Sequence, residues 1–143
     1  MKYKIKVEYK IGIVVAKFNK EITEKMKDYA LNYAKQSGVA VTQIIEVPGS
    51  FEIPFGVQIL LEKDEIKGVI TLGAIIKGDT EHDKVIAYAI ANKIADLSLT
   101  YKKPVSLGII GPDATWQQAL KRRKEYAERS VQAVTDMLDI LFE

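Results

Sequence analysis

Short apolar runs alternate with longer amphipathic segments four times along this chain. The runs are rich in Val and Ile and almost unbroken, and they cover residues 11–16, 39–47, 69–76 and 105–110. Such runs are typical of strands that are covered on both faces. After each run, apolar residues recur every three or four positions. This spacing predicts helices around residues 22–33, 51–62, 86–101 and 120–141.

The order of these elements predicts the fold class. A strand followed by a helix, repeated four times, implies a parallel sheet with right-handed crossovers and helices on both faces. Gly38 and Pro104 follow the first and third helices, and Pro54 is compatible with the first turn of the second. We therefore expect an α/β protein, a three-layer α/β/α sandwich around a four-stranded parallel sheet.

The N-terminal segment has a different pattern. Tyr3, Ile5 and Val7 alternate with lysines, which predicts either an edge strand or a strand that pairs with a neighbouring subunit. Four core strands are few for helices of this length. We therefore expect the helices to pack between subunits as well.

The amino-acid composition excludes several kinds of catalytic and metal site. The 143 residues predict a single domain, 1–143, and 48% hydrophobic with 28% charged residues is typical of a soluble globular protein. The absence of cysteine excludes disulfides, thiolate zinc sites, iron–sulfur clusters and thiol nucleophiles, and one histidine excludes a His-rich metal centre within a chain. No metal site is therefore expected. Proton transfer near neutral pH must use His82 or an acid, lysine or tyrosine with an altered pKa.

Charge and hydropathy exclude several partners. A net charge of +2 does not favour nucleic acid. The longest apolar stretch, residues 68–76, is about half of a membrane span. The first ten residues lack the apolar segment of a signal peptide. We expect a cytoplasmic protein without a membrane or nucleic-acid partner.

The residues that follow the four predicted strands carry most of the candidate chemistry. Ligands of open α/β sheets bind outside the carboxyl ends of the strands. The segments at those ends are Lys-Phe-Asn (17–19), Pro-Gly-Ser-Phe-Glu (48–52), Lys-Gly-Asp-Thr-Glu-His (77–82) and Gly-Pro-Asp (111–113). The only histidine, two aromatic residues and a carboxylate should therefore lie at one edge of the sheet.

The segment before the third helix has two interpretations. Thr80 or Asp79 suits the N-cap, and Asp83 fits a capping box with Thr80. A helix start also presents free N–H groups that can bind phosphate. His82, in the first turn, is either a solvated structural histidine or a base.

Similar alternatives apply elsewhere. Phe18 is either a core residue or a platform for a flat ligand, and Glu52 is either a favourable first-turn acid or a partner of ligand hydroxyls. In the basic run 121–129, most charges form i,i+4 pairs. Arg122 has no such acid, and it lies two turns from Arg129 on the same side of the helix. These two arginines could bind a phosphate.

Four segments in order resemble the signature segments of the lumazine synthase family. They are KFNKEIT (17–23), VPGSFEIP (47–54), LGAIIKGDTEHD (72–83) and QALKR (118–122), and GPDATWQQALKR resembles the archaeal branch. The resemblance covers nearly the whole chain. It implies a flavodoxin-like fold and a transferase of riboflavin biosynthesis. That enzyme condenses 5-amino-6-(D-ribitylamino)uracil with 3,4-dihydroxy-2-butanone 4-phosphate to 6,7-dimethyl-8-ribityllumazine, phosphate and water, without a cofactor.

The resemblance also implies roles for individual residues. Phe18 would stack on the pyrimidine, and Glu52 would bind the ribityl hydroxyls. His82 matches the proton-transfer residue, while Asp79, Thr80 and Arg122 would hold the phosphate, with Arg129 nearby. The backbone segments around the pyrimidine and ribityl chain would comprise Ser50, Phe51, Glu52, Ala74, Ile75 and Ile76.

Two departures bear on these roles. Leu107 stands where many relatives place an aromatic residue from the adjacent subunit. The unusual GPDATW loop leaves the register of Arg122 against Arg123 open. Family members assemble as pentamers or as icosahedral shells of 60 subunits with sites between neighbours, and the sequence does not choose between them.

Two other functions fit the same fold. One is the archaeal type of riboflavin synthase, a paralogue that the Gly-Asp-Thr-Glu-His-Asp motif argues against. The other is a non-catalytic shell protein or module that binds flavin or lumazine. A binder without turnover would need neither His82 nor Arg122, so the presence of both favours the enzyme.

Overall fold

The computed structural model describes residues 8–143. The expected N-terminal strand at Tyr3, Ile5 and Val7 therefore lies outside the described residues. Four strands alternate with four helices and one short 3-10 turn, in the order β1 (Tyr9–Ala16), α1 (Lys20–Ala34), β2 (Val39–Val47), η1 (Ser50–Glu52), α2 (Ile53–Leu61), β3 (Gly68–Ile76), α3 (His82–Tyr101), β4 (Val105–Ala114) and α4 (Trp116–Leu141).

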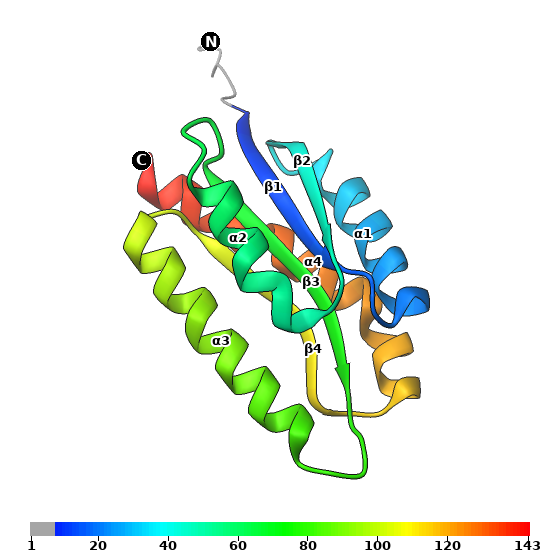
Figure 1. The fold of residues 1–143 in the computed structure, drawn as a ribbon. Coiled ribbons are helices and arrows are strands. Elements are labelled where there is room, and N and C mark those ends of the chain that lie inside the picture. The colour runs from blue at the N-terminus through cyan, green and yellow to red at the C-terminus, as the bar shows by residue number, and fades with distance from the viewer. Residues whose placement is uncertain (1–7) are drawn as a thin grey trace.

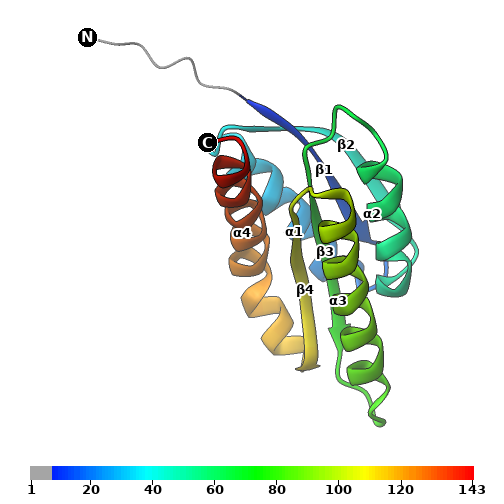
Figure 2. The same ribbon diagram turned by 90° about the vertical axis from the view of Figure 1, so that its left-hand side faces the viewer.

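The strands form one parallel sheet in the order β2-β1-β3-β4. Helices α2 and α3 cover one face, and α1 and α4 cover the other (Figure 1). The view turned by 90° shows these three layers edge-on (Figure 2). The structure thus confirms the expected α/β sandwich with a four-stranded parallel sheet. None of the helices within residues 8–143 is long and apolar enough to span a membrane.

Each face of the sheet has its own core. Ile13 and Ile70 belong to the core under α1 and α4, whereas Val14 and Val69 belong to the core under α2 and α3. Neighbouring residues of one strand thus enter opposite cores, as the alternation of side chains along a strand requires. Burial on both faces explains why these strands read as unbroken apolar runs.

The tip of β4 departs from the sequence-based expectation. The apolar run predicted that the strand ends at residue 110, but pairing with β3 resumes at Ala114. The register jumps from Ala74–Ile110 to Ile76–Ala114, so residues 111–113 bulge opposite Ile75. Gly111 has a φ of 115°, and a Cβ there would overlap the carbonyl oxygen of Ile75. This bulge brings β4 close to the segment that follows β3.

The expected second helix is divided in two. Residues 50–52 form the 3-10 turn η1, and α2 begins at Ile53 with Pro54 in its first turn. Gly73 makes room for this turn, because a Cβ at Gly73 would lie 2.9 Å from Ser50 Oγ. The turn therefore lies directly against β3, at the carboxyl edge of the sheet.

Candidate active site

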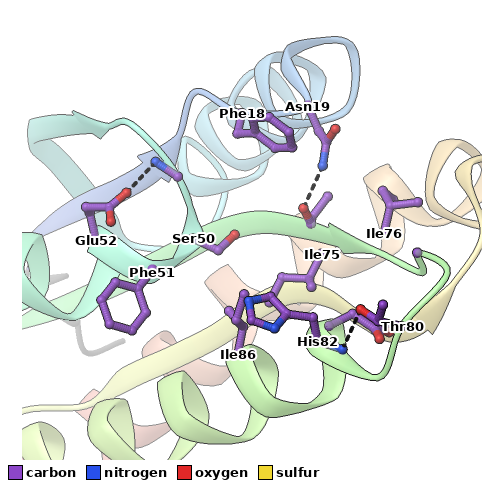
Figure 3. Close-up of a pocket in the computed structure, with 14 residues that line it drawn as sticks. Phe18, Asn19, Ser50, Phe51, Glu52, Ile75, Ile76, Thr80, His82 and Ile86 are labelled. Atoms are coloured by element: carbon purple, nitrogen blue, oxygen red, sulfur yellow. Dashed lines mark hydrogen bonds between the residues drawn. The ribbon is translucent and has the colours of Figure 1, made fainter.

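A cavity of about 360 Å³ opens at the carboxyl edge of the sheet. Residues from the ends of β1, β2 and β3 and from the start of α3 line it (Figure 3). Most of the predicted site residues meet here: Phe18, Ser50, Phe51, Glu52, Ala74, Ile75, Ile76, Thr80 and His82. The parallel sheet brings these segments together, because all its strands end at the same edge.

The first wall is built by the turn after β1. Asn19 adopts a left-handed conformation with φ 64°, which asparagine tolerates better than most residues. Its side-chain N–H donates to the carbonyl oxygen of Ala74 at 2.9 Å and so ties this turn to β3. Phe18 is left projecting, with 69% of its surface exposed. An exposed ring beside a cavity is available to stack on a flat ligand.

The second wall is the 3-10 turn after β2. The Gly49 N–H donates to Glu52 Oε1 at 2.9 Å, and the Glu52 N–H donates back to the Gly49 carbonyl at 3.2 Å. One carboxylate oxygen of Glu52 therefore caps the turn. The same side chain also lines the cavity, where it can bind a ligand hydroxyl. Phe51 is 68% exposed on the same turn.

The third wall is the segment between β3 and α3, residues 77–82, called here the 77–82 loop. His82 is the first residue of α3, and its side chain lines the cavity opposite Phe18 (Figure 3). The N–H of His82 donates to Thr80 Oγ1 at 3.3 Å. Asp79 is exposed and does not line the cavity.

The expected capping box is wrong. The N-cap of α3 is Glu81, and its own side chain accepts no capping hydrogen bond. Asp83 is buried, with 7% of its surface exposed, and its carboxylate accepts a hydrogen bond from the Asp113 N–H at 3.1 Å. The bulge in β4 brings Asp113 to this position, and the sequence pattern did not predict that bulge.

Charges at the cavity are unevenly distributed. Glu52, His82 and Asp83 line it, but no lysine or arginine of residues 8–143 does. Lys84, in the first turn of α3, lies 2.9 Å from Glu81 and 3.7 Å from Asp113 and does not line the cavity. A hydrogen bond to Glu81, and secondarily the charge of Asp113, raises the pKa of Lys84 above its ordinary value. The described part of the chain also gathers no cluster of side chains able to hold a metal ion.

Three predicted residues lie away from this cavity. Leu107, on the edge strand β4, and Arg129, on α4, line a separate hollow together with Tyr126. Arg122 is exposed on α4. The folded chain alone does not bring these three residues to the cavity.

The neighbouring Arg123 is engaged within the fold. Its guanidinium donates to the carbonyl oxygens of Leu120 and Glu21, each at 3.0 Å. These bonds join α4 to the start of α1. Arg122 has no such partner in the described chain and keeps its guanidinium available for a ligand.

Known proteins resemble this chain over most of its length. The family model described as 6,7-dimethyl-8-ribityllumazine synthase matches residues 8–141. The chain belongs to this family. Proteins of that name from Metallosphaera sedula and Methanopyrus kandleri are 52% and 50% identical to it. The first match covers 90% of this chain and 85% of the relative, and the second covers 92% of each.

Sequence reasoning missed several residues that line the cavity: Asn19, Gly49, Gly78, Asp83 and Ile86. Asn19, Gly49 and Gly78 belong to the segments that follow the strands, so their position could have identified them as cavity residues. Ile86 lies one turn after His82 on the same face of α3. Asp83 gave no distinct signal, because an acid in the first turn of a helix is ordinary.

Proposed function

We propose that the chain catalyses the condensation of 5-amino-6-(D-ribitylamino)uracil with 3,4-dihydroxy-2-butanone 4-phosphate to 6,7-dimethyl-8-ribityllumazine, phosphate and water. The observation that carries this proposal is the convergence of Phe18, Glu52 and His82 on one cavity of a chain that belongs to this family. The cavity thus offers an aromatic platform, a carboxylate and an imidazole.

The first two walls fit the pyrimidine substrate. Phe18 supplies the stacking surface, and the backbone of residues 50–52 and 74–76 supplies hydrogen-bonding groups for the ring edge and the ribityl chain. Glu52 uses one oxygen for the Gly49 N–H, which leaves the other for ribityl hydroxyls. Because these groups are already tied to β3 and to each other, little ordering is needed on binding.

The third wall fits the phosphate substrate. The 77–82 loop leads into the N-terminus of α3. The backbone N–H groups of Asp79 and Thr80, just before the helix, would bind the phosphate beside the positive end of the helix dipole. His82 stands beside them and serves as the proton-transfer group. The pyrimidine's amine attacks the substrate carbonyl and water leaves as the Schiff base forms. Phosphate then departs and the ring closes with loss of water, so protons must be moved repeatedly.

A dianionic phosphate also requires a cation, and residues 8–143 place none in the cavity of their own subunit. We propose that Arg122, with Arg129 near the same phosphate and Leu107 against the pyrimidine, comes from an adjacent copy of the chain. The engagement of Arg123 in the fold supports Arg122 as the ligand. Exposed apolar side chains on α2 and α3, including Phe55, Val85 and Tyr88, support self-association.

Holding two reactants in one orientation contributes much of the acceleration, up to about 7–11 kcal/mol in favourable cases. The rest comes from proton transfer and from stabilisation of the leaving phosphate. No step needs a metal or a redox cofactor. The expected cytoplasmic location stays a prediction.

One assay tests the proposal. The purified chain is mixed with both substrates, and lumazine absorbance and free phosphate are measured. Equal production of both, above the uncatalysed rate, is expected. No product would contradict the proposal, riboflavin formed from lumazine alone would indicate the paralogue, and binding without turnover would indicate a flavin- or lumazine-binding protein. Sedimentation velocity then distinguishes a pentamer from a 60-subunit shell.

A further inference from the structure

Asp83 is the only ionisable side chain among the buried residues of the described chain. Within residues 8–143 the Asp83 carboxylate forms no ion pair, and it accepts one hydrogen bond, from the Asp113 N–H. Burial of a carboxylate costs free energy unless hydrogen bonds compensate it. The Asp113 N–H supplies such a hydrogen bond, so the buried carboxylate is tied to the bulge of β4.

The contact joins the bulge of β4 to the first turn of α3, and Asp83 itself lines the cavity. Asp113 stands in the β4 bulge with φ 62°, and its N–H points to the first turn of α3. Next to it, the Lys77 N–H donates to the Ala114 carbonyl at 2.8 Å. The 77–82 loop is thus fastened to the tip of β4 at both ends, by Lys77–Ala114 at the start and by Asp83–Asp113 at the finish.

Between these fastenings the loop has little support of its own. Residues 77–81 belong to no helix or strand, and residues 77–82 are all exposed. The only side-chain hydrogen bond recorded within it is the 3.3 Å bond between Thr80 and His82. An ion pair adds to the second fastening, since Lys84 reaches the Asp113 carboxylate at 3.7 Å, although such an exposed pair contributes little.

We propose that Asp83 is a positioning residue for the proposed reaction: by binding the Asp113 N–H it holds the 77–82 loop and His82 in place for the phosphate substrate. The inference rests on the proposed function. Its basis is the geometry of β4, α3 and the loop between β3 and α3. The pyrimidine walls are fastened independently, by Asn19–Ala74 and Gly49–Glu52, so Asp83 acts on one substrate only.

The test compares Asp83→Ala with Asp83→Asn, which keeps an oxygen acceptor for the Asp113 N–H. In the alanine variant, amide exchange at Asp113 and along residues 77–82 becomes faster. The KM for the butanone phosphate rises about 10-fold, the loss expected for one hydrogen bond to a charged group. The KM for the pyrimidine changes less than about 2-fold. The asparagine variant stays close to wild type in exchange and in both KM values.

Asp96→Ala is the matched control, because Asp96 is an exposed acid on the same helix and lies outside the cavity. It leaves exchange and KM values unchanged. If Asp83→Ala does not fold, Asp83→Leu fills the buried volume without an acceptor and must give the same pattern. Equal changes in both KM values, unchanged exchange at Asp113, or an asparagine variant as defective as alanine would overturn the proposal.

Failure of the proposed function would look different. Wild-type protein would then form no lumazine, whereas the exchange of the Asp113 amide would still report whether Asp83 holds the loop. If the wild type is active and Asp83→Ala is equally active, only the positioning role is contradicted.

Discussion

The 3-10 turn at residues 50–52 and the 77–82 loop are two walls of one cavity, but they are held in different ways. The turn is closed by reciprocal bonds between Gly49 and Glu52 and lies against Gly73 of β3. The loop is exposed and depends on contacts with the tip of β4 at its ends. The 3-10 turn is thus preorganised by its own hydrogen bonds, and the 77–82 loop by hydrogen bonds with β4.

This difference matches the chemistry proposed for each wall. A flat, uncharged pyrimidine is recognised by fixed backbone groups and a ring, which tolerate little movement. A phosphate ester is recognised by charge and must leave during the reaction. We infer that mutations in the two walls separate into effects on the pyrimidine and effects on the phosphate substrate.

The largest effect is expected for His82→Ala on the loop wall. Removal of a general acid–base group lowers kcat by about 100-fold, but the reaction persists because both reactants remain oriented. Steady-state kinetics with both substrates measures this loss in kcat, and the two KM values should change much less. A variant that keeps the wild-type kcat would show that His82 transfers no proton.

Arg122→Ala tests whether Arg122 of an adjacent copy supplies the cation for the phosphate. Loss of a charged hydrogen bond should raise the KM for the butanone phosphate about 30-fold and that for the pyrimidine less than about 3-fold. Steady-state kinetics with each substrate varied in turn gives both values. The matched control is Arg123→Ala, which breaks bonds to Leu120 and Glu21 and should lower thermal stability instead. Equal KM changes for both substrates would remove Arg122 from the phosphate site.

Phe18→Ala tests the pyrimidine side of the cavity, on the turn after β1. Loss of stacking should raise the KM for the pyrimidine about 10-fold, since an aromatic pair contributes roughly 0.5–1.5 kcal/mol beyond burial. The KM for the butanone phosphate should stay near wild type. Phe18→Tyr keeps the ring and should remain within about 2-fold. If alanine and tyrosine behave alike, the ring does not stack on substrate.

The smallest effect on catalysis is expected for Lys103→Met, which touches neither wall. The ammonium of Lys103 donates to the carbonyl oxygens of Leu61 and Lys63 at 2.9 and 3.0 Å, at the end of α2. Its loss should reduce the free energy of unfolding by about 1 kcal/mol and leave kcat and KM unchanged. Denaturant unfolding measures the first quantity, and a change in either kinetic constant would link α2 to the site.

The same lysine gives a pH dependence. Burial lowers the pKa of Lys103 below the ordinary lysine value of 10.5. Just below pH 10.5, the unfolded chain therefore binds more protons than the folded chain. The free energy of unfolding of the wild type, relative to Lys103→Met, should rise with pH in that window. A flat difference would show that burial does not perturb this amine.

The sequence predicted β2 at residues 39–47 with both boundaries correct, and it placed Phe18, Glu52 and His82 at one sheet edge. Both predictions use local information, because unbroken Val- and Ile-rich runs indicate buried parallel strands and such strands end at a common edge. The tip of β4 was missed, since Gly-Pro-Asp reads as a loop and only its contact with Ile75 shows a bulge. Asp83 was missed because an acid in the first turn of a helix is ordinary.

The sequence by itself determined the order of strands and helices, the chemistry available to the chain and the segments that carry it. Tertiary structure decided how those segments are held. The bond between Asp83 and Asp113 joins residues thirty positions apart, and Arg123 reaches Glu21 across 102 positions. Neither is visible in a local pattern, because a hydrogen bond depends on distance and direction in space and not on separation along the chain.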